Sequence, residues 1–289
     1  YAVVKAGLLK ASDSRVLSVV MVYLVTPCVI INAFQIDDTP EIRKGLLYSM
    51  AIAAAIHVVL LVLSALLSRP LKLDAVEQVN VIYSNAAALV IPLVKALMGD
   101  AYVIYSCAFI IVQLVLLWTH ASSLLQGSSA LDWKKVLTNI NMIAIAAGAL
   151  LYWFRVVLPA PLQNTMSTVG NMMGPMGMLL AGMAIAEKPL REVFCTRRNY
   201  LPTVLRLVVC PLVVLVLLWV CHASSWVADG KNILMTVYLA AITPACATVT
   251  SMAQLYDRDA AHSSALYVLT TLLSIVSMPV MIGLFDLLL

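Results

Sequence analysis

Charged residues are scarce in this sequence. Asp, Glu, Lys and Arg together make up 11% of its 289 residues, whereas a typical soluble domain has about 25%. Apolar residues make up 63%, and they form long continuous runs instead of alternating with polar residues. This composition excludes a soluble globular domain, a disordered chain and a nucleic-acid binder. The continuous runs predict an all-α polytopic membrane protein.

Catalytic and metal-binding patterns are also missing. The six cysteines include no Cys-x-x-Cys pair, and five of them lie in or at apolar runs, which is typical of small buried side chains. The sequence has no HExxH motif, no GxSxG motif and no phosphate-binding loop. It also lacks the charged ring or filter motif of a channel. We therefore expect no enzyme activity, no cofactor and no metal, and a transport function that does not use ATP hydrolysis by this chain.

Nine apolar stretches are long enough for a spanning helix, which needs about 20 residues. Residues 1–9 have the pattern of the last turn of a further helix, and the chain begins with Tyr1. We therefore expect ten helices in the native protein, with the first helix largely missing from this chain. The nine predicted spans are 15–36, 44–68, 77–98, 101–126, 136–158, 163–186, 200–223, 231–255 and 261–287.

The Lys and Arg residues of the loops predict the orientation. If the loop before the first complete span is cytoplasmic, twelve of the 18 Lys and Arg residues lie on the cytoplasmic side, five lie on the other side and Arg206 lies within a helix. Short cytoplasmic loops are enriched in Lys and Arg, so this distribution favours that orientation. We expect a multi-pass protein of the inner (plasma) membrane.

Prolines inside the apolar runs recur at a nearly constant offset. Pro27 and Pro175 are 148 residues apart, and Pro92 and Pro244 are 152 residues apart. Two pairs at almost the same separation indicate a duplicated unit. With five helices in each unit, the two copies would have opposite topology and form an inverted repeat.

The second proline pair predicts two broken helices. A proline within a helix removes one backbone donor and leaves the carbonyl four residues earlier without its partner. Such a carbonyl is costly in hydrocarbon unless it faces protein or a water-filled cavity. Pro92 and Pro244 therefore predict discontinuous fourth and ninth helices that cross near the bilayer centre and offer their N-terminal N–H groups to an anion. Two ordinary proline kinks are the alternative.

Short motifs with a recognisable order and spacing extend over nearly the whole chain. The motifs are Ser84-Asn85-x5-Ile91-Pro92, Tyr23-Leu24-x-x-Pro27, the run 179–186, Arg206-Leu207-x3-Pro211, Thr243-Pro244-Ala245 and the run 270–279. In their order and spacing they resemble the auxin efflux carrier family, the bacterial relatives of plant PIN proteins. One departure is that Ala87 and Val90 stand where the family has two glycines in its fourth helix.

The resemblance implies two inverted five-helix repeats with crossed fourth and ninth helices. It also implies an elevator-type carrier that exports a small organic anion, usually a carboxylate, across the lipid bilayer. We further predict a homodimer formed through the scaffold, where a Met- and Gly-rich run permits close helix approach. The implied division is scaffold helices 1–36 and 136–186, transport-domain helices 37–126 and 187–289, and a cytoplasmic linker 127–135.

Candidate substrate-binding residues gather around the two predicted breaks. The amide of Asn85 could donate to a carboxylate or bond the freed backbone. Threonine hydroxyls near the second break could contact the substrate or bond carbonyls of their own helix. The candidates are Asn85, Ala86, Pro92, Thr243, Pro244 and Thr248.

Two further residues are candidates for moving a proton or attracting an anion. His57 lies deep in a span and could carry a proton, or remain neutral and hydrogen-bonded. Arg206 could attract a cytoplasmic anion, or extend its charged end to the lipid headgroups.

The alternative function is a cation-coupled (Na⁺ or H⁺) symporter or antiporter of similar crossed-helix fold, like the bile-acid symporters. Such sites usually place acidic residues at the crossover. Here no Asp or Glu lies between Gln78 and Gly99, or between Lys231 and Tyr256. This favours an anion site and leaves proton coupling open.

Overall fold

The structure of the chain is a computed structural model. It describes residues 2–35, 39–127, 134, 137–138, 140–173, 175–176, 179, 182–183, 186 and 190–289. The regular elements over these residues are helices, which confirms the all-α prediction.

Four helices of the described residues are long and apolar enough to cross a membrane. Each begins and ends within a few residues of a predicted span, and two of them contain a π-helical turn. The four are α4 (Pro40–Ser68); α7 (Val103–Leu116) with η4 (Leu117–Ala121) and α8 (Ser122–Gln126); η5 (Arg197–Asn199) with α14 (Tyr200–Val204), η6 (Leu205–Val209) and α15 (Cys210–Val220); and α18 (Ala260–Leu288).

Side chains at the first turns help to fix where these helices begin. The Thr39 hydroxyl accepts a hydrogen bond from the Ile42 N–H at 3.3 Å, and Pro40 occupies the first turn of α4. The Asp259 carboxylate accepts from the His262 N–H at 2.8 Å at the start of α18. Both are side-chain caps for N–H groups that have no partner within the helix.

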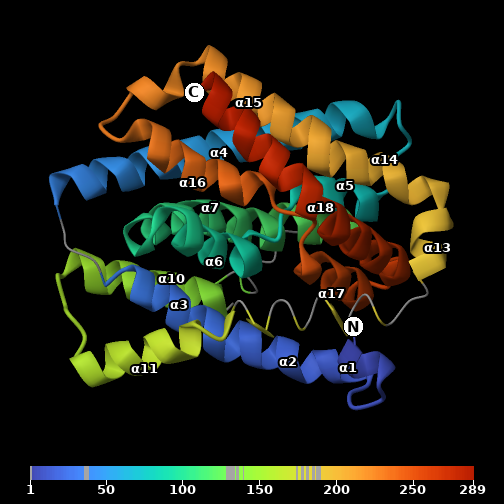
Figure 1. Cartoon of the computed structure of the whole chain (residues 1–289), viewed down its shortest axis with the longest axis horizontal. Coiled ribbons are helices and arrows are strands. Elements are labelled where there is room, and N and C mark those ends of the chain that lie inside the picture. The colour runs from blue at the N-terminus through green and yellow to red at the C-terminus, as the bar shows by residue number, and fades with distance from the viewer. Residues whose placement is uncertain are drawn as a thin grey trace.

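Helices from two separate parts of the chain, residues 2–33 and 140–170, lie along one edge of the molecule, at the bottom of Figure 1. Helix α10 packs so closely on α3 that a Cβ atom on Gly148 would lie 2.5 Å from the Phe34 ring. Pro27 lies at the second position of α3 and does not interrupt it. The members are α1 (Ala2–Lys5), η1 (Ala11–Asp13), α2 (Ser14–Val20), η2 (Met21–Val25), α3 (Thr26–Ala33), α10 (Ile140–Trp153) and α11 (Ala160–Gly170).

Parts of the predicted scaffold and linker fall outside the described residues. These parts include most of the linker 127–135 and several residues of the span 163–186. Within that span, α11 ends at Gly170 and Asn171 follows in a turn.

Two predicted spans, 77–98 and 231–255, are each interrupted. Tyr83 and Thr243 have extended backbone, and each follows the last residue of a half-helix. Helices α4, α7, α15 and α18 pack against the paired half-helices, and α4, α7 and α16 contact one another. The half-helices are α5 (Ala75–Ile82) and α6 (Ala86–Met98), then α16 (Gly230–Ile242) and α17 (Ala247–Leu255); the remaining elements are η3 (Asp100–Tyr102), α13 (Leu190–Cys195) and η7 (Ala223–Ser225).

The expectation that the first interruption lies at Pro92 is wrong. Pro92 lies inside α6, and the non-helical residues begin nine positions earlier at Tyr83. A proline removes only one backbone hydrogen bond, so the helix continues past it. The interruption occurs where the Gln113 side chain of α7 binds the backbone of Ser84. Pro244, by contrast, lies within the second interruption as expected.

Candidate substrate site at the paired helix interruptions

The two interruptions are hydrogen-bonded to each other. Ser84 and Ala245 form an antiparallel β-bridge. The Asn85 N–H donates to the Pro244 carbonyl at 2.8 Å, and the Cys246 N–H donates to the Tyr83 carbonyl at 3.1 Å. Segments about 160 residues apart in the sequence thus pair backbone groups that a continuous helix would have satisfied internally.

Gln113 of α7 completes the hydrogen bonding of the first interruption. Its Oε1 accepts from the Ser84 N–H at 3.0 Å and from the Ser84 hydroxyl at 2.7 Å, and its Nε2 donates to the Ser84 carbonyl at 2.8 Å. The side chain is 3% exposed. The Gln113 amide therefore binds both the N–H and the carbonyl of Ser84, as the backbone of a neighbouring strand would.

Thr270 of α18 has a corresponding position at the second interruption. Its hydroxyl accepts from the Ala245 N–H at 3.2 Å. In both cases the supporting side chain comes from the long helix that follows the interrupted pair. These contacts satisfy buried backbone groups that would otherwise be costly in an apolar environment.

Arg206 lies at the C-terminal ends of both first half-helices. Its Nη1 donates to the Val81 and Ile82 carbonyls at 3.1 and 3.2 Å, and its Nε and Nη2 donate to the Thr243 carbonyl at 3.0 and 2.8 Å. Nη2 also donates to the Ala241 carbonyl. The residue is 1% exposed, so the guanidinium is enclosed by protein and does not extend to the surface.

Five of the six predicted substrate-binding residues lie at the interruptions, namely Asn85, Ala86, Thr243, Pro244 and Thr248. Asn85 precedes the first turn of α6, is 6% exposed, and makes no side-chain capping hydrogen bond within the described structure. Ala86 and Thr243 are fully buried, and the Thr243 hydroxyl donates to the Ala240 carbonyl at 3.0 Å. Thr243 thus bonds its own helix, which is one of the two roles considered for it. Thr248 is half-buried in the first turn of α17.

Pro92 lines a cavity of about 540 Å³ instead of the interruption. The cavity lies between α6 and α7 on one side and α3 and α11 on the other. Its polar lining residues include Asn32, Gln35, Asn171 and Lys95, and none of these carries a negative charge. Lys95 was not among the predicted site residues. Its position three residues after Pro92 places both residues on one face of a helix.

His57 is fully buried away from the cavity lining. Its Nδ1 lies 2.7 Å from the Ala53 carbonyl, and its ring packs 4.5 Å from the Phe109 ring. A carbonyl only accepts hydrogen bonds, so Nδ1 carries the proton. Nε2 has no hydrogen-bond partner among the described residues. This geometry suits a neutral imidazole.

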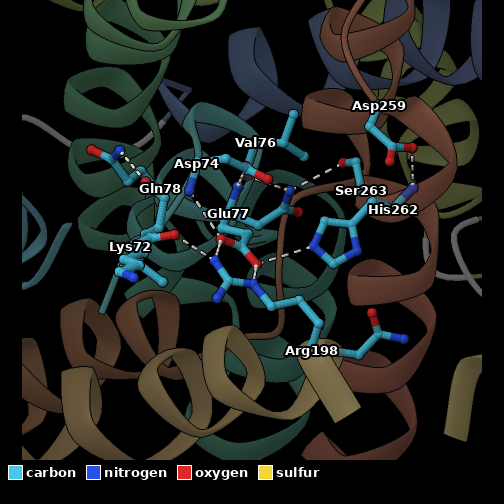
Figure 2. Close-up of polar contacts among 12 residues, drawn as sticks. Lys72, Asp74, Val76, Glu77, Gln78, Arg198, Asp259, His262 and Ser263 are labelled. Atoms are coloured by element: carbon cyan, nitrogen blue, oxygen red, sulfur yellow. Dashed lines mark hydrogen bonds and ion pairs between the residues drawn. The ribbon is translucent and has the colours of Figure 1, made fainter. Parts of the chain in front are cut away.

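A second polar cluster lies at the start of α5 (Figure 2). The Glu77 carboxylate is fully buried and binds the Arg198 guanidinium through both oxygens. It also accepts from the Asp74 N–H at 2.9 Å in a reciprocal capping box, and it lies 3.3 Å from His262 Nε2. Arg198 donates to the Lys72 carbonyl at 2.6 Å. The cluster thus joins α5, η5 and α18.

The cluster also contains potential metal ligands. Asp74, Glu77 and His262 offer ligand atoms within 4.8 Å of one another. Both Glu77 oxygens already bind Arg198, however, so a metal ion would have to displace a guanidinium. The cluster is therefore better described as an ion pair with supporting hydrogen bonds that connects α5, η5 and α18. Asp and Glu three residues apart at the start of a helix form the sequence signal of a capping box.

The apolar spanning helices and the buried polar contacts at two interruptions define a membrane transport protein. The family model described as "Membrane transport protein" matches residues 1–132 and 128–282. The chain therefore belongs to this family, which includes the auxin efflux carriers, and the resemblance seen in the sequence is confirmed. Members of the family are transporters and not enzymes. No curated protein matches the chain.

Proposed function

We propose that the protein is a secondary transporter that exports a small organic anion, with a carboxylate as the favoured class. The anion binds beside the paired interruptions, near the middle of the bilayer. The observation that carries the proposal is the start of α6, where the buried Asn85 side chain makes no capping hydrogen bond within the described structure. A carboxylate can accept from the Asn85 amide and from the N–H groups of the first turn.

The charge around this position favours an anion. The Thr243 carbonyl binds Arg206, and the next carbonyl, that of Pro244, binds the Asn85 N–H. One peptide unit therefore separates a buried guanidinium from the start of α6. No Asp or Glu lies between Gln78 and Gly99 or between Lys231 and Tyr256, so neither interrupted segment carries a charge that would repel a carboxylate.

We propose that the two interrupted pairs cross within two inverted repeats, which form a scaffold (1–36 and 136–186) and a transport domain (37–126 and 187–289). The antiparallel bridge, and the matching support from Gln113 and Thr270, favour two related units. The cavity beside Pro92 lies between α3 and α11 of the proposed scaffold and α6 and α7 of the proposed transport domain. An elevator movement of one against the other would carry a bound anion across the inner membrane, and a homodimer through the scaffold would hold that part fixed.

A sodium-coupled carrier needs oxygen ligands for its cation. The carbonyls of Val81, Ile82, Ala241 and Thr243 converge at the interruptions, and Arg206 binds all four. This observation favours the anion carrier over the sodium-coupled alternative.

Asn85 provides the test of the proposed site. We expect Asn85→Ala to weaken binding of the best carboxylate about tenfold, which corresponds to about 1.4 kcal/mol. Asn85→Asp should weaken it further because it adds a like charge beside the substrate. Carboxylate-dependent thermal stabilisation of the purified protein, screened over mono- and dicarboxylates, measures both effects.

Asn232→Ala is the matched control, since Asn232 is an exposed amide that donates to Asp229 near the start of α16. The control should bind like the parent protein. If Asn85→Asp binds the anion as tightly as the parent, Asn85 has a structural role and the site lies elsewhere.

A further inference from the structure

Arg206 is bound in an unusual way for a buried arginine. It makes five hydrogen bonds to four main-chain carbonyls, and no carboxylate of the described residues pairs with it. Two of the carbonyls belong to the end of α5, and the other two lie at the end of α16 and just after it. A buried charge is costly unless hydrogen bonds and nearby dipoles compensate for it, so the arrangement calls for a physical explanation.

The ends of two helices supply that compensation. The last carbonyls of a helix have no partner within the helix, and they form the negative end of its dipole. Here two such ends point to the same buried place, where each unsatisfied carbonyl would be costly. A guanidinium has five N–H donors in a planar fork, whereas a lysine ammonium has three donors at one point. Arginine is therefore the side chain that can bind all four carbonyls together.

Two of the carbonyls that Arg206 binds lie one residue from a hydrogen bond between the interruptions. It binds the Ile82 carbonyl, and the next carbonyl, that of Tyr83, accepts from the Cys246 N–H. It binds the Thr243 carbonyl, and the next carbonyl, that of Pro244, accepts from the Asn85 N–H. The guanidinium therefore holds both strands of the bridge from the same side.

The local helix geometry places Arg206 at this point. It lies in the five-residue π-helical turn η6, a type of turn that is frequent at functional sites. Pro211 follows in α15 and has no N–H to offer to the Leu207 carbonyl. Regular α-helical bonding at Leu207 is thus blocked by the sequence itself, at the turn that carries the arginine.

We propose that Arg206 is the positioning residue of the substrate site. Its guanidinium holds the ends of α5 and α16 together, and this keeps Asn85 and the first N–H groups of α6 in the geometry that binds an anion. Its positive charge, one peptide unit from Asn85, adds to the attraction. The inference deepens the proposed function and rests on it for the identity of the ligand.

Arg206→Lys tests the proposal because lysine keeps the positive charge but lacks the planar arrangement of five N–H donors. We expect amide hydrogen exchange at Asn85 and Cys246 to become at least tenfold faster, and carboxylate binding to weaken about tenfold. Arg206→Ala, prepared with millimolar guanidinium present, should regain slow exchange and binding with guanidinium but not with equal sodium chloride. Arg258→Ala is the control, since Arg258 donates to the Leu125 carbonyl at 2.5 Å outside the interruptions; it should change neither measurement.

The two readouts separate the possible failures. If Arg206→Lys exchanges and binds like the parent, the proposal is overturned. Faster exchange with unchanged carboxylate binding also overturns it, because Arg206 would then be structural only. If no carboxylate binds the parent protein, the proposed function fails, while the exchange rates and the guanidinium rescue still decide whether Arg206 holds the two interruptions together.

Discussion

Two arginines of one membrane-spanning segment have opposite surroundings. Arg198 is at the start of the segment, its side chain is 43% exposed, and it pairs with the buried Glu77 carboxylate (Figure 2). Arg206 follows eight residues later, about 12 Å further along a helix, and binds carbonyls only. The charge of Arg198 is compensated by a carboxylate, whereas that of Arg206 is compensated by main-chain carbonyls and has no acidic partner among the described residues. This difference supports the proposal that an anion binds at the interruptions.

The comparison also explains why Glu77 is compatible with an anion carrier. It is the acidic residue nearest in sequence to the first interruption, and it is fully buried. Its two oxygens bind Arg198, and the Asp74 N–H supports one of them. An ion pair with both partners in place presents little net charge to its surroundings, so Glu77 does not oppose a carboxylate at Asn85.

The largest expected effect comes from breaking the compensated pair. Arg198→Met leaves a buried carboxylate without its partner, and we expect it to lower the free energy of unfolding by about 3 kcal/mol. The double variant with Glu77→Gln should recover most of that loss, because it removes the unpaired charge. Denaturant unfolding in detergent gives the free energy of unfolding of the parent protein, of Arg198→Met and of the double variant.

The neighbouring exposed Arg197 provides the control for this pair. Arg197→Met should change the unfolding free energy by no more than about 0.5 kcal/mol. An equal effect of Arg197→Met and Arg198→Met on the unfolding free energy would show that the ion pair with Glu77 contributes nothing specific. The contrast between Arg198 and Arg206 would then be wrong.

A smaller effect is expected at the first interruption. Gln113→Leu removes the partners of the Ser84 N–H and carbonyl, so we expect a loss of about 2 kcal/mol in unfolding free energy together with weaker carboxylate binding. Gln163→Leu in α11 is the control, since the Gln163 side chain donates one part-buried hydrogen bond among the described residues, to the Leu158 carbonyl. Thermal unfolding with and without carboxylate gives both values. Unchanged binding in Gln113→Leu would separate the first interruption from the substrate site.

The smallest effect is expected at the cavity beside Pro92. Lys95→Gln should weaken carboxylate binding about threefold at low ionic strength, because Lys95 is an exposed cation in the cavity lining. The difference should vanish in high salt, where the screening length falls to about 3 Å. Lys44→Gln, at an exposed lysine outside the lining, should have no effect. A Lys95→Gln defect that persists in high salt would mean that Lys95 acts through packing and not through charge.

The sequence predicted the helices better than the contacts between them. Continuous apolar runs gave the long helices, because spanning a membrane imposes a length that a single segment reveals. Pro244 marked the second interruption, but Pro92 did not mark the first, because one missing hydrogen bond does not end a helix. The first interruption depends on Gln113, which is 29 residues away in the sequence.

The site was predictable in part for the same reason. Asn85 stood out as a polar residue in an apolar run. The role of Arg206 was hidden, because its four carbonyl partners carry no signal in the amino-acid sequence and meet only in the folded chain. Glu77 was not predicted as a site residue, because it lies at the start of its helix, one residue before the segment 78–99 that contains no Asp or Glu.

The bonds of Arg206 also impose an order on the assembly of the protein during synthesis. Val81 and Arg206 are 125 residues apart, whereas Gln113 follows Ser84 by 29. At roughly 5–20 residues per second, the ribosome needs about 6–25 s to add Arg206 after Val81. During that time the end of α5 has Gln113 nearby but not its arginine, so its last carbonyls must stay in contact with water or with the insertion machinery. The first half of the chain is therefore inserted with an unfinished polar centre, which the second half completes.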